Sequence, residues 1–161
     1  MKKRIIPLIL AALCVLTLIT GAVLARQQQA LSDKLVRLHV VANSDSDGDQ
    51  AVKLRVRDAV LDMTQAILRD TDDPVAALGV HLAEIEQAAG ETLRENGCQL
   101  LVTVTLQNEL FPRRDYDTFS LPAGVYRTLR VTIGAGEGHN WWCVLYPTLC
   151  QVDESALDVQ S

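Results

Sequence analysis

Cysteine and histidine side chains in this sequence could form a nucleophile and its base. Cys143 is the candidate nucleophile, and His39 or His139 could take its proton. A reactive thiol needs a positive neighbour or a helix N-terminus that lowers its pKa, but Cys143 directly follows two tryptophans. A pair of His39 and Asp45 is the other candidate. One hypothesis is therefore a small extracytoplasmic hydrolase that uses Cys143 or the His39/Asp45 pair. It is the weaker of two hypotheses, and the other is a protein without enzymatic activity.

Metal and phosphate sites are represented only by incomplete patterns. The run NSDSDGD, residues 43–49, has oxygen side chains and a glycine at the offsets of a calcium loop, but its twelfth position is Leu54 where a glutamate is needed. The cysteines after residue 90 lack the paired short spacings of a zinc site. No lysine follows the glycines of residues 134–138, as a P-loop would require. We therefore expect no catalytic residue, no metal and no cofactor.

The polar run 43–49 is expected to form a strand-to-helix turn. Aspartate and serine side chains there can bind the free amides of a helix N-terminus and oppose its positive dipole end. Six polar side chains and a glycine exceed what a cap requires, so a recognition surface remains open as a second interpretation.

The first 25 residues have the pattern of an export segment. Positive charges in residues 1–4 precede the uncharged stretch Ile5–Leu24, and small residues allow cleavage after Ala25. The apolar stretch is also long enough to remain as a membrane anchor. We predict a signal peptide or N-terminal anchor over residues 1–25, an exported domain over 26–152 and an acidic flexible tail over 153–161. Membrane contact is expected only through residues 5–24, if they are not removed.

The charge balance of the exported part excludes some partners. The chain has 15 Lys and Arg against 20 Asp and Glu, and removal of Lys2, Lys3 and Arg4 leaves 12 against 20, a net charge of −8. This argues against nucleic acid and anionic membrane surfaces as partners. The remaining residues, about 135, are enough for one domain with its own core.

Hydrophobic periodicity predicts an α+β fold: one N-terminal strand, two consecutive helices, then a mostly antiparallel set of three to four strands in a single domain. The helix pair is expected to cross over between parallel strands, and the later strands have only short turns between them. The expected elements are a strand at Leu35–Val41, helices at Gln50–Arg69 and from Asp73 to Asn96, and strands at 99–107, 116–121, 125–133 and 141–146.

All aromatic side chains are concentrated in one part of the chain. They lie between Phe111 and Tyr146, and Trp141 and Trp142 are adjacent. Aromatic residues bury the most area per residue and dominate cores and interfaces. This region is therefore expected to be a packing centre, a contact surface or both.

Two long blocks of sequence resemble a known family. RLHVVANSDSDGDQAVKLRVRDAVL at residues 37–61 and LPAGVYRTLRVTIGAGEGHNWWCVLYPTLC at 121–150 are similar to the signature blocks of the stage II sporulation protein R family. With the segment between them, the resemblance covers roughly Leu31 to Val152. It implies a non-enzymatic signalling protein, exported into the space between the forespore and mother-cell membranes. There it would activate a membrane-embedded aspartic protease of the mother cell, which processes the pro-form of the mother-cell sigma factor.

The resemblance supplies no catalytic residues, so the hypothesis needs a contact surface instead. Because they lie in the matching blocks, the candidates for partner contact are Asn43, Ser44, Asp45, Ser46, Asp47, His139, Asn140, Trp141 and Trp142.

A disulfide between Cys143 and Cys150 is the favoured pairing after export. Exported domains can keep disulfides, and Pro147 can fold the chain back between the two cysteines. The alternatives are three buried thiols, or a bridge that includes Cys98. Intact mass after alkylation, with and without prior reduction, distinguishes them. We expect one alkylated cysteine in the unreduced exported protein, and three would contradict any bridge.

Overall fold

The inner strand β1 (Val36–Val41) organises the sheet. The computed structural model describes residues 2–115 and 120–147. In it β1 pairs in parallel with β5 (Gly124–Ile133) and antiparallel with β6 (Asn140–Tyr146). The outer strand β2 (Val102–Phe111) is antiparallel to β5, so the order is β2-β5-β1-β6. Every residue of β1 is buried, which is why its sequence is apolar without alternation.

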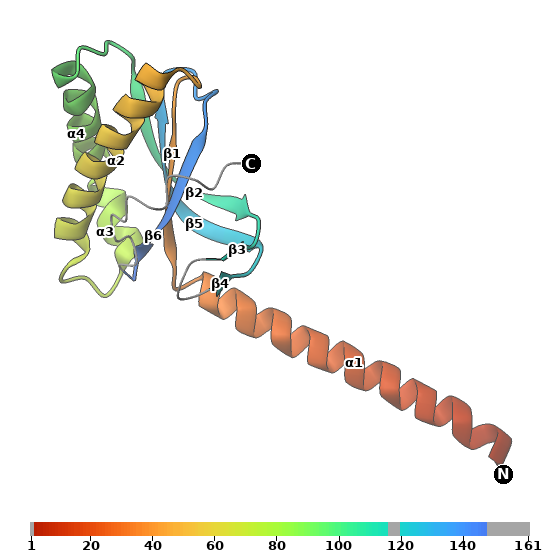
Figure 1. Cartoon of the computed structure of the whole chain (residues 1–161). Coiled ribbons are helices and arrows are strands. Elements are labelled where there is room, and N and C mark those ends of the chain that lie inside the picture. Colours follow the sequence, from red (N-terminus) through yellow and green to blue (C-terminus); the bar gives the residue numbers. More distant parts are fainter. Residues whose placement is uncertain (1, 116–119, 148–161) are drawn as a thin grey trace.

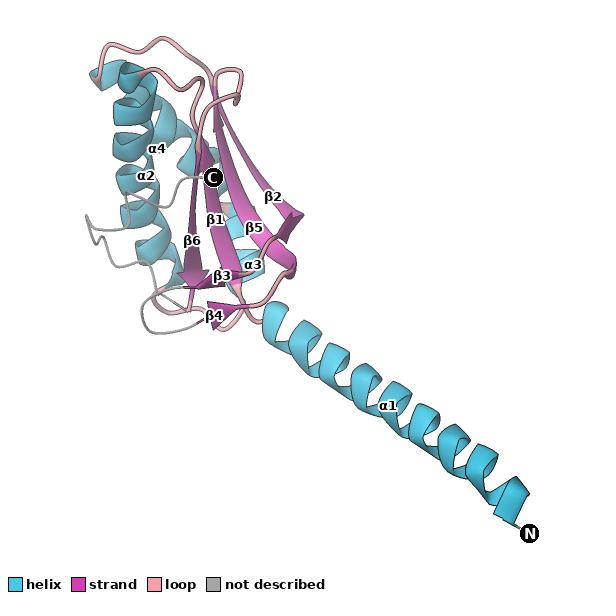
Figure 2. Ribbon diagram, turned by 45° about the vertical axis from the view of Figure 1, so that its right-hand side comes forward, coloured by secondary structure: helices cyan, strands magenta, loops and turns pink. Residues whose placement is uncertain are grey.

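Three helices cover one face of this sheet: α2 (Asp47–Leu68), α3 (Pro74–Val80) and α4 (Leu82–Glu95) (Figures 1 and 2). Their apolar stripes meet alternate residues of the inner strands in one core. Its fully buried members include Leu38, Val40, Val56, Val60, Leu78, Ile85, Leu93, Leu129, Val131 and Ile133.

The opposite face of the sheet carries charged and aromatic side chains. Arg37 is fully buried there, and its guanidinium carbon lies 3.8 Å from the ring centroid of Phe111 and 5.2 Å from that of Tyr126. These cation–π contacts offset part of the cost of burying the charge. The short strands β3 (Arg114–Asp115) and β4 (Ser120–Leu121) form a separate two-stranded sheet.

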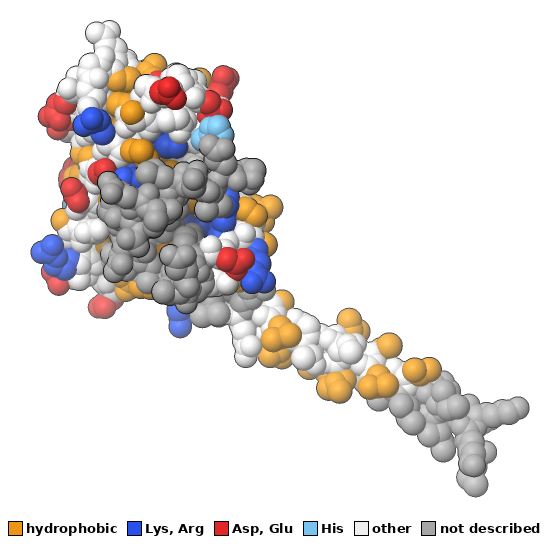
Figure 3. Space-filling model, viewed as in Figure 1, with side chains coloured by type: hydrophobic (Ala, Val, Ile, Leu, Met, Phe, Trp, Pro, Cys, Tyr) orange, Lys and Arg blue, Asp and Glu red, His pale blue; other side chains and the backbone are white. Residues whose placement is uncertain are grey.

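Helix α1 (Lys2–Ser32) projects away from the sheet (Figure 1), and apolar side chains are exposed along it (Figure 3). Among the side chains described there, the large exposed apolar ones are Leu10, Leu13, Val15, Leu16, Leu18, Ile19, Val23 and Leu24. Within residues 2–115 and 120–147, no helix meets the combined length and hydropathy needed to cross a membrane.

The predicted fold class is confirmed, and two details of it are wrong. The second helix is interrupted at His81, which leaves helical geometry with φ −104° and ψ 8° just after Gly79, a residue that weakens helices. The crossover helices also do not make strand 99–107 parallel to β1. They deliver the chain to edge strand β2, and the next strand, β5, turns back and lies beside β1. The predicted tail 153–161, and residues 116–119 of the predicted short strand, lie outside the described residues.

Candidate functional site

Two segments far apart in sequence meet at one end of the sheet. Val41, the last residue of β1, pairs with Asn140, the first residue of β6. Beyond this pair the backbones stay bonded: Gly138 N–H donates to the carbonyl of Ala42 (3.0 Å), and Glu137 N–H donates to that of Asn43 (3.1 Å). We call residues 43–47 and 134–140 together the loop junction.

Side chains of the first segment hold the backbone of the second. Asp45 Oδ1 accepts the backbone N–H of His139 at 2.6 Å and lies 2.5 Å from its ring Nδ1. Asn43 Oδ1 accepts the N–H of Ala135 at 2.9 Å. These hydrogen bonds between the two segments therefore explain part of the unusual polarity of the first segment.

Other polar side chains of the run 43–49 lie at the N-terminus of helix α2. Ser46 is the N-cap, and its hydroxyl accepts the N–H of Asp49 at 3.2 Å. The Asp49 carboxylate in turn accepts from Ser44 Oγ at 2.5 Å and Asn43 Nδ2 at 2.8 Å. The hydrogen bond from Ser44, followed by that from Asn43, holds the pKa of Asp49 below its ordinary value.

Gly138 is required by the close approach of the two segments. A Cβ at this position would overlap the backbone carbonyl of Ser44. Gly134 has φ +55°, a left-handed conformation that other residues rarely adopt, and it packs on the side chain of Asn43. These two glycines thus serve turn geometry and close packing.

Helix α2 is bonded to both segments, through Lys53 to the second and through Gln50 to the first. Lys53 is buried, and its Nζ donates to Gln50 Oε1 at 2.6 Å and to the His139 carbonyl at 3.1 Å. Gln50 Nε2 donates to the Ser44 carbonyl at 2.9 Å. Burial lowers the pKa of Lys53, and this effect outweighs the negative charge of Asp45, which raises it. Lys53 precedes Val56 by three residues and Val60 by seven, a spacing that places it on the same side of α2 as these buried residues.

The exposed part of the loop junction is small. Asp45 and His139 keep about half of their side-chain area exposed, at 55% and 54%. Ser46, Asp47 and Asn140 are also exposed. Asp47 stands in the first turn of α2 and makes no side-chain bond with another described residue.

The two predicted contact tryptophans, Trp141 and Trp142, are half-buried on opposite faces of β6, and their part in partner contact stays a prediction. Trp141 packs against the helix-side core, with the Arg57 guanidinium carbon 5.0 Å from its ring centroid. Trp142 packs edge-on to Phe111, and the Arg114 guanidinium carbon lies 4.3 Å from its ring. Both rings therefore support the strand that carries the loop junction.

Comparison with known proteins identifies the family. The family model described as stage II sporulation protein R matches residues 32–156. The chain is 36% identical over 169 aligned positions to stage II sporulation protein R of Bacillus subtilis strain 168, covering 96% of this chain and 74% of that protein. The chain belongs to the stage II sporulation protein R family. No solved structure matches it. Both segments of the loop junction lie inside the matched region, which makes the junction part of the family's own domain.

The residues of the hydrolase hypothesis are not assembled as proposed. His39 binds Glu109 and Asn140 on the sheet face opposite the helices, so the His39/Asp45 pair is wrong; Asp45 binds His139 instead. Cys143 is on the helix-side face of β6 and is disulfide-bonded, whereas Cys14 and Cys98 are free among the described residues. Cys150 lies outside the described residues, so its pairing with Cys143 stays a prediction.

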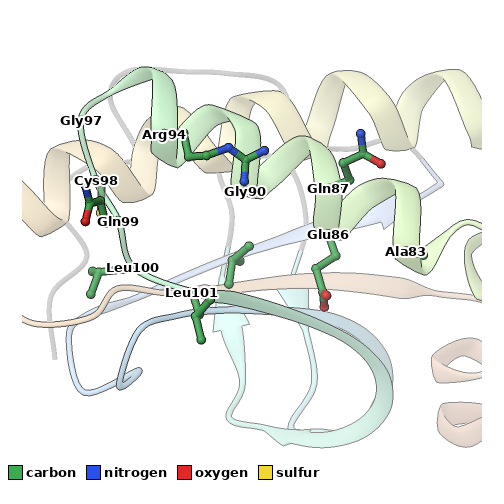
Figure 4. A pocket seen from close by; sticks show the side chains of 11 residues that line it. Ala83, Glu86, Gln87, Gly90, Arg94, Gly97, Cys98, Gln99, Leu100 and Leu101 are labelled. Carbon is green, nitrogen blue, oxygen red and sulfur yellow. The ribbon is translucent and has the colours of Figure 1, made fainter.

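A hollow of about 650 Å³ lies between α4 and the segment that enters β2 (Figure 4). Its wall includes Arg94, Cys98 and Glu86, and the Glu86 carboxylate is used to accept the N–H of Val104 at 2.9 Å. No residue of the loop junction lines this hollow. The candidate site is therefore an exposed surface, separate from this hollow.

Glu109 was missed by sequence reasoning because the predicted strand ended at Gln107. Its carboxylate binds His39, Arg130 and Gln107 at 2.8, 2.9 and 2.8 Å. Burial would raise the pKa of Glu109, but the hydrogen bonds from Arg130, His39 and Gln107 outweigh it and hold this pKa below its ordinary value.

Substitution of Gly138 tests the close approach in the loop junction. Gly138→Ala should lower the free energy of unfolding by about 1–3 kcal/mol, because the new methyl group displaces the Ser44 backbone. Gly48→Ala is the matched control: nothing lies within 4 Å, and alanine in helix α2 should add up to about 1 kcal/mol. Urea unfolding of the three proteins measures both changes, and equal stabilities would contradict the close approach of Gly138 to Ser44.

Replacement of Glu109 should change how the free energy of unfolding depends on pH in the acid range. The lowered folded-state pKa means that its contribution is fully present above the ordinary glutamate pKa, about 4.3, and is lost as pH falls through the folded value. The unfolding free energy of wild type should exceed that of Glu109→Gln at about pH 6, and the gap should close towards about pH 3. A gap independent of pH would show that the carboxylate's charge is not involved.

Proposed function

We propose that this chain is an exported signalling protein that activates a membrane-embedded aspartic protease of the mother cell, which then processes the pro-form of the mother-cell sigma factor. The loop junction is the proposed contact surface. Membership of a sporulation family supports the cellular setting. The observation that supports this contact surface is that the two sequence blocks, residues 37–61 and 121–150, meet in one exposed patch. Several hydrogen bonds join the two segments there.

Rigidity makes the loop junction suited to recognition. Its backbone is fixed by bonds from Asp45, Asn43 and Lys53, so little ordering entropy is lost when a partner binds. Asp47 and the exposed sides of Asp45 and His139 then present polar groups in defined positions. These side chains would supply specificity in the proposed complex.

Export is the second part of the proposal. It rests on the positive residues before the apolar stretch 5–24, which the structure builds into helix α1. The protein would act in the space between the forespore and mother-cell membranes. If the segment is retained, residues 5–24 would provide its membrane contact.

Co-expression tests activation directly. The full chain should be produced with a candidate membrane protease and its sigma-factor precursor in a host that does not form spores, and precursor processing followed by immunoblot. Processing should require both proteins. Processing by a form that lacks residues 2–25 and stays in the cytoplasm would contradict the need for export.

Charge reversal tests the contact surface in the same assay. Asp47→Lys should reduce processing at least about tenfold, because an interfacial charge of the wrong sign costs several kcal/mol. Asp70→Lys is the control: it makes the same change on an exposed residue beyond the other end of α2, about 33 Å along the helix. Full activity of Asp47→Lys, or equal loss in both variants, would remove the loop junction from the proposed interface.

A further inference from the structure

His39 is a buried side chain that joins two different parts of the sheet. It lies on inner strand β1 and is 7% exposed, so a partner protein has little access to it. Its ring Nδ1 lies 2.8 Å from Glu109 Oε2 on β2, and its Nε2 lies 2.8 Å from Asn140 Oδ1 on β6. Both ring nitrogens are therefore used, one toward each side of the sheet.

The Glu109 side of this link is firmly held. Arg130 Nη1 donates to the other carboxylate oxygen at 2.9 Å, and Gln107 Nε2 donates to the same oxygen at 2.8 Å. Aromatic rings close the space around the imidazole: Phe111 and Trp142 have centroids 6.1 and 5.6 Å from it. The imidazole thus has one fixed position, set by the interior of the sheet.

The Asn140 side of the link belongs to the loop junction. Asn140 is the first residue of β6 and directly follows His139, whose backbone N–H and ring bind Asp45. The bond from His39 therefore fixes the residue at which the second loop segment enters the sheet. A shift of Asn140 would move His139 relative to Asp45.

We infer that His39 is a positioning residue for the loop junction: through its Nε2 contact with Asn140 it holds the start of β6, and with it His139, in the arrangement that a partner contacts. This inference rests on the proposed function only for its consequence in signalling. Its structural part concerns the chain alone. Among residues 2–115 and 120–147, the charged groups bonded to this network or stacked on its aromatic rings are Glu109 and Arg130, with Arg37 and Arg114 over the rings.

Two substitutions separate the contacts of the two ring nitrogens. The amide of asparagine reaches the position of Nδ1, so His39→Asn can keep the bond to Glu109 and loses the one to Asn140. The longer side chain of glutamine reaches the position of Nε2, so His39→Gln can keep the bond to Asn140 and loses the one to Glu109. Both remove the imidazole and its capacity for charge, so a purely structural role for the ring predicts equal effects.

Hydrogen exchange on the full chain in detergent provides the first readout. Amide exchange at residues 139–141 should rise about tenfold in His39→Asn and less than about threefold in His39→Gln. Unfolding midpoints in urea, measured alongside, correct for global loss of stability. Equal exchange in the two variants, or no change in His39→Asn, would overturn the inference.

The co-expression assay provides the second readout. If wild type promotes precursor processing, His39→Asn should lower it about tenfold and His39→Gln should retain most of it. Retained processing by His39→Asn despite faster exchange would overturn the role in partner contact. If wild type promotes no processing, the proposed function fails, while the exchange result still decides whether His39 positions the loop junction.

Discussion

The pairing of β1 with both β5 and β6 is the constraint on which the other features depend. A strand buried on both faces and bonded along both edges has a fixed register, because a slip of one residue would exchange its core side chains with Arg37 and His39. That register places Val41 opposite Asn140 and so brings the segment after β1 against the segment before β6. The loop junction is a consequence of sheet topology, completed by local bonds.

The two faces of β1 impose different chemistry on alternate residues. Leu38 and Val40 face the helices, where burial of apolar area is the main stabilising term. Arg37 and His39 face the other way, where each polar group must find a partner or an aromatic ring. Glu109 is placed to receive His39 and Arg130 together. Such a network contributes less to net stability than an apolar core would, and its hydrogen bonds are satisfied only while the strands that share it keep this register.

Sequence patterns predicted the fold class and most elements, because amphipathic periodicity is a local property. The strand order is not local: the apolar run at 36–41 indicated a buried strand but not its neighbours. The break at His81 is a change in the backbone of a single turn. The spacing of apolar residues along the helices does not reveal it. At the site, the sequence patterns singled out the polar run 43–49 and the glycines of residues 134–138 separately. Their meeting, and the buried link from Lys53 to His139, required the β1–β6 pairing to be known.

The polar run 43–49 shows why composition alone could not separate structure from recognition. A calcium loop, a helix cap and a binding surface all call for Asp, Asn and Ser. In the folded chain Ser46 caps α2, Asn43 and Asp45 hold the second segment of the loop junction, and Asp49 accepts hydrogen bonds from Ser44 and Asn43. Only the side chain of Asp47 is left without a described internal bond. A surface built this way has most of its polar groups committed before any partner arrives, so what it presents is determined by the fold beneath it, and a buried residue such as His39 can affect recognition without touching the partner.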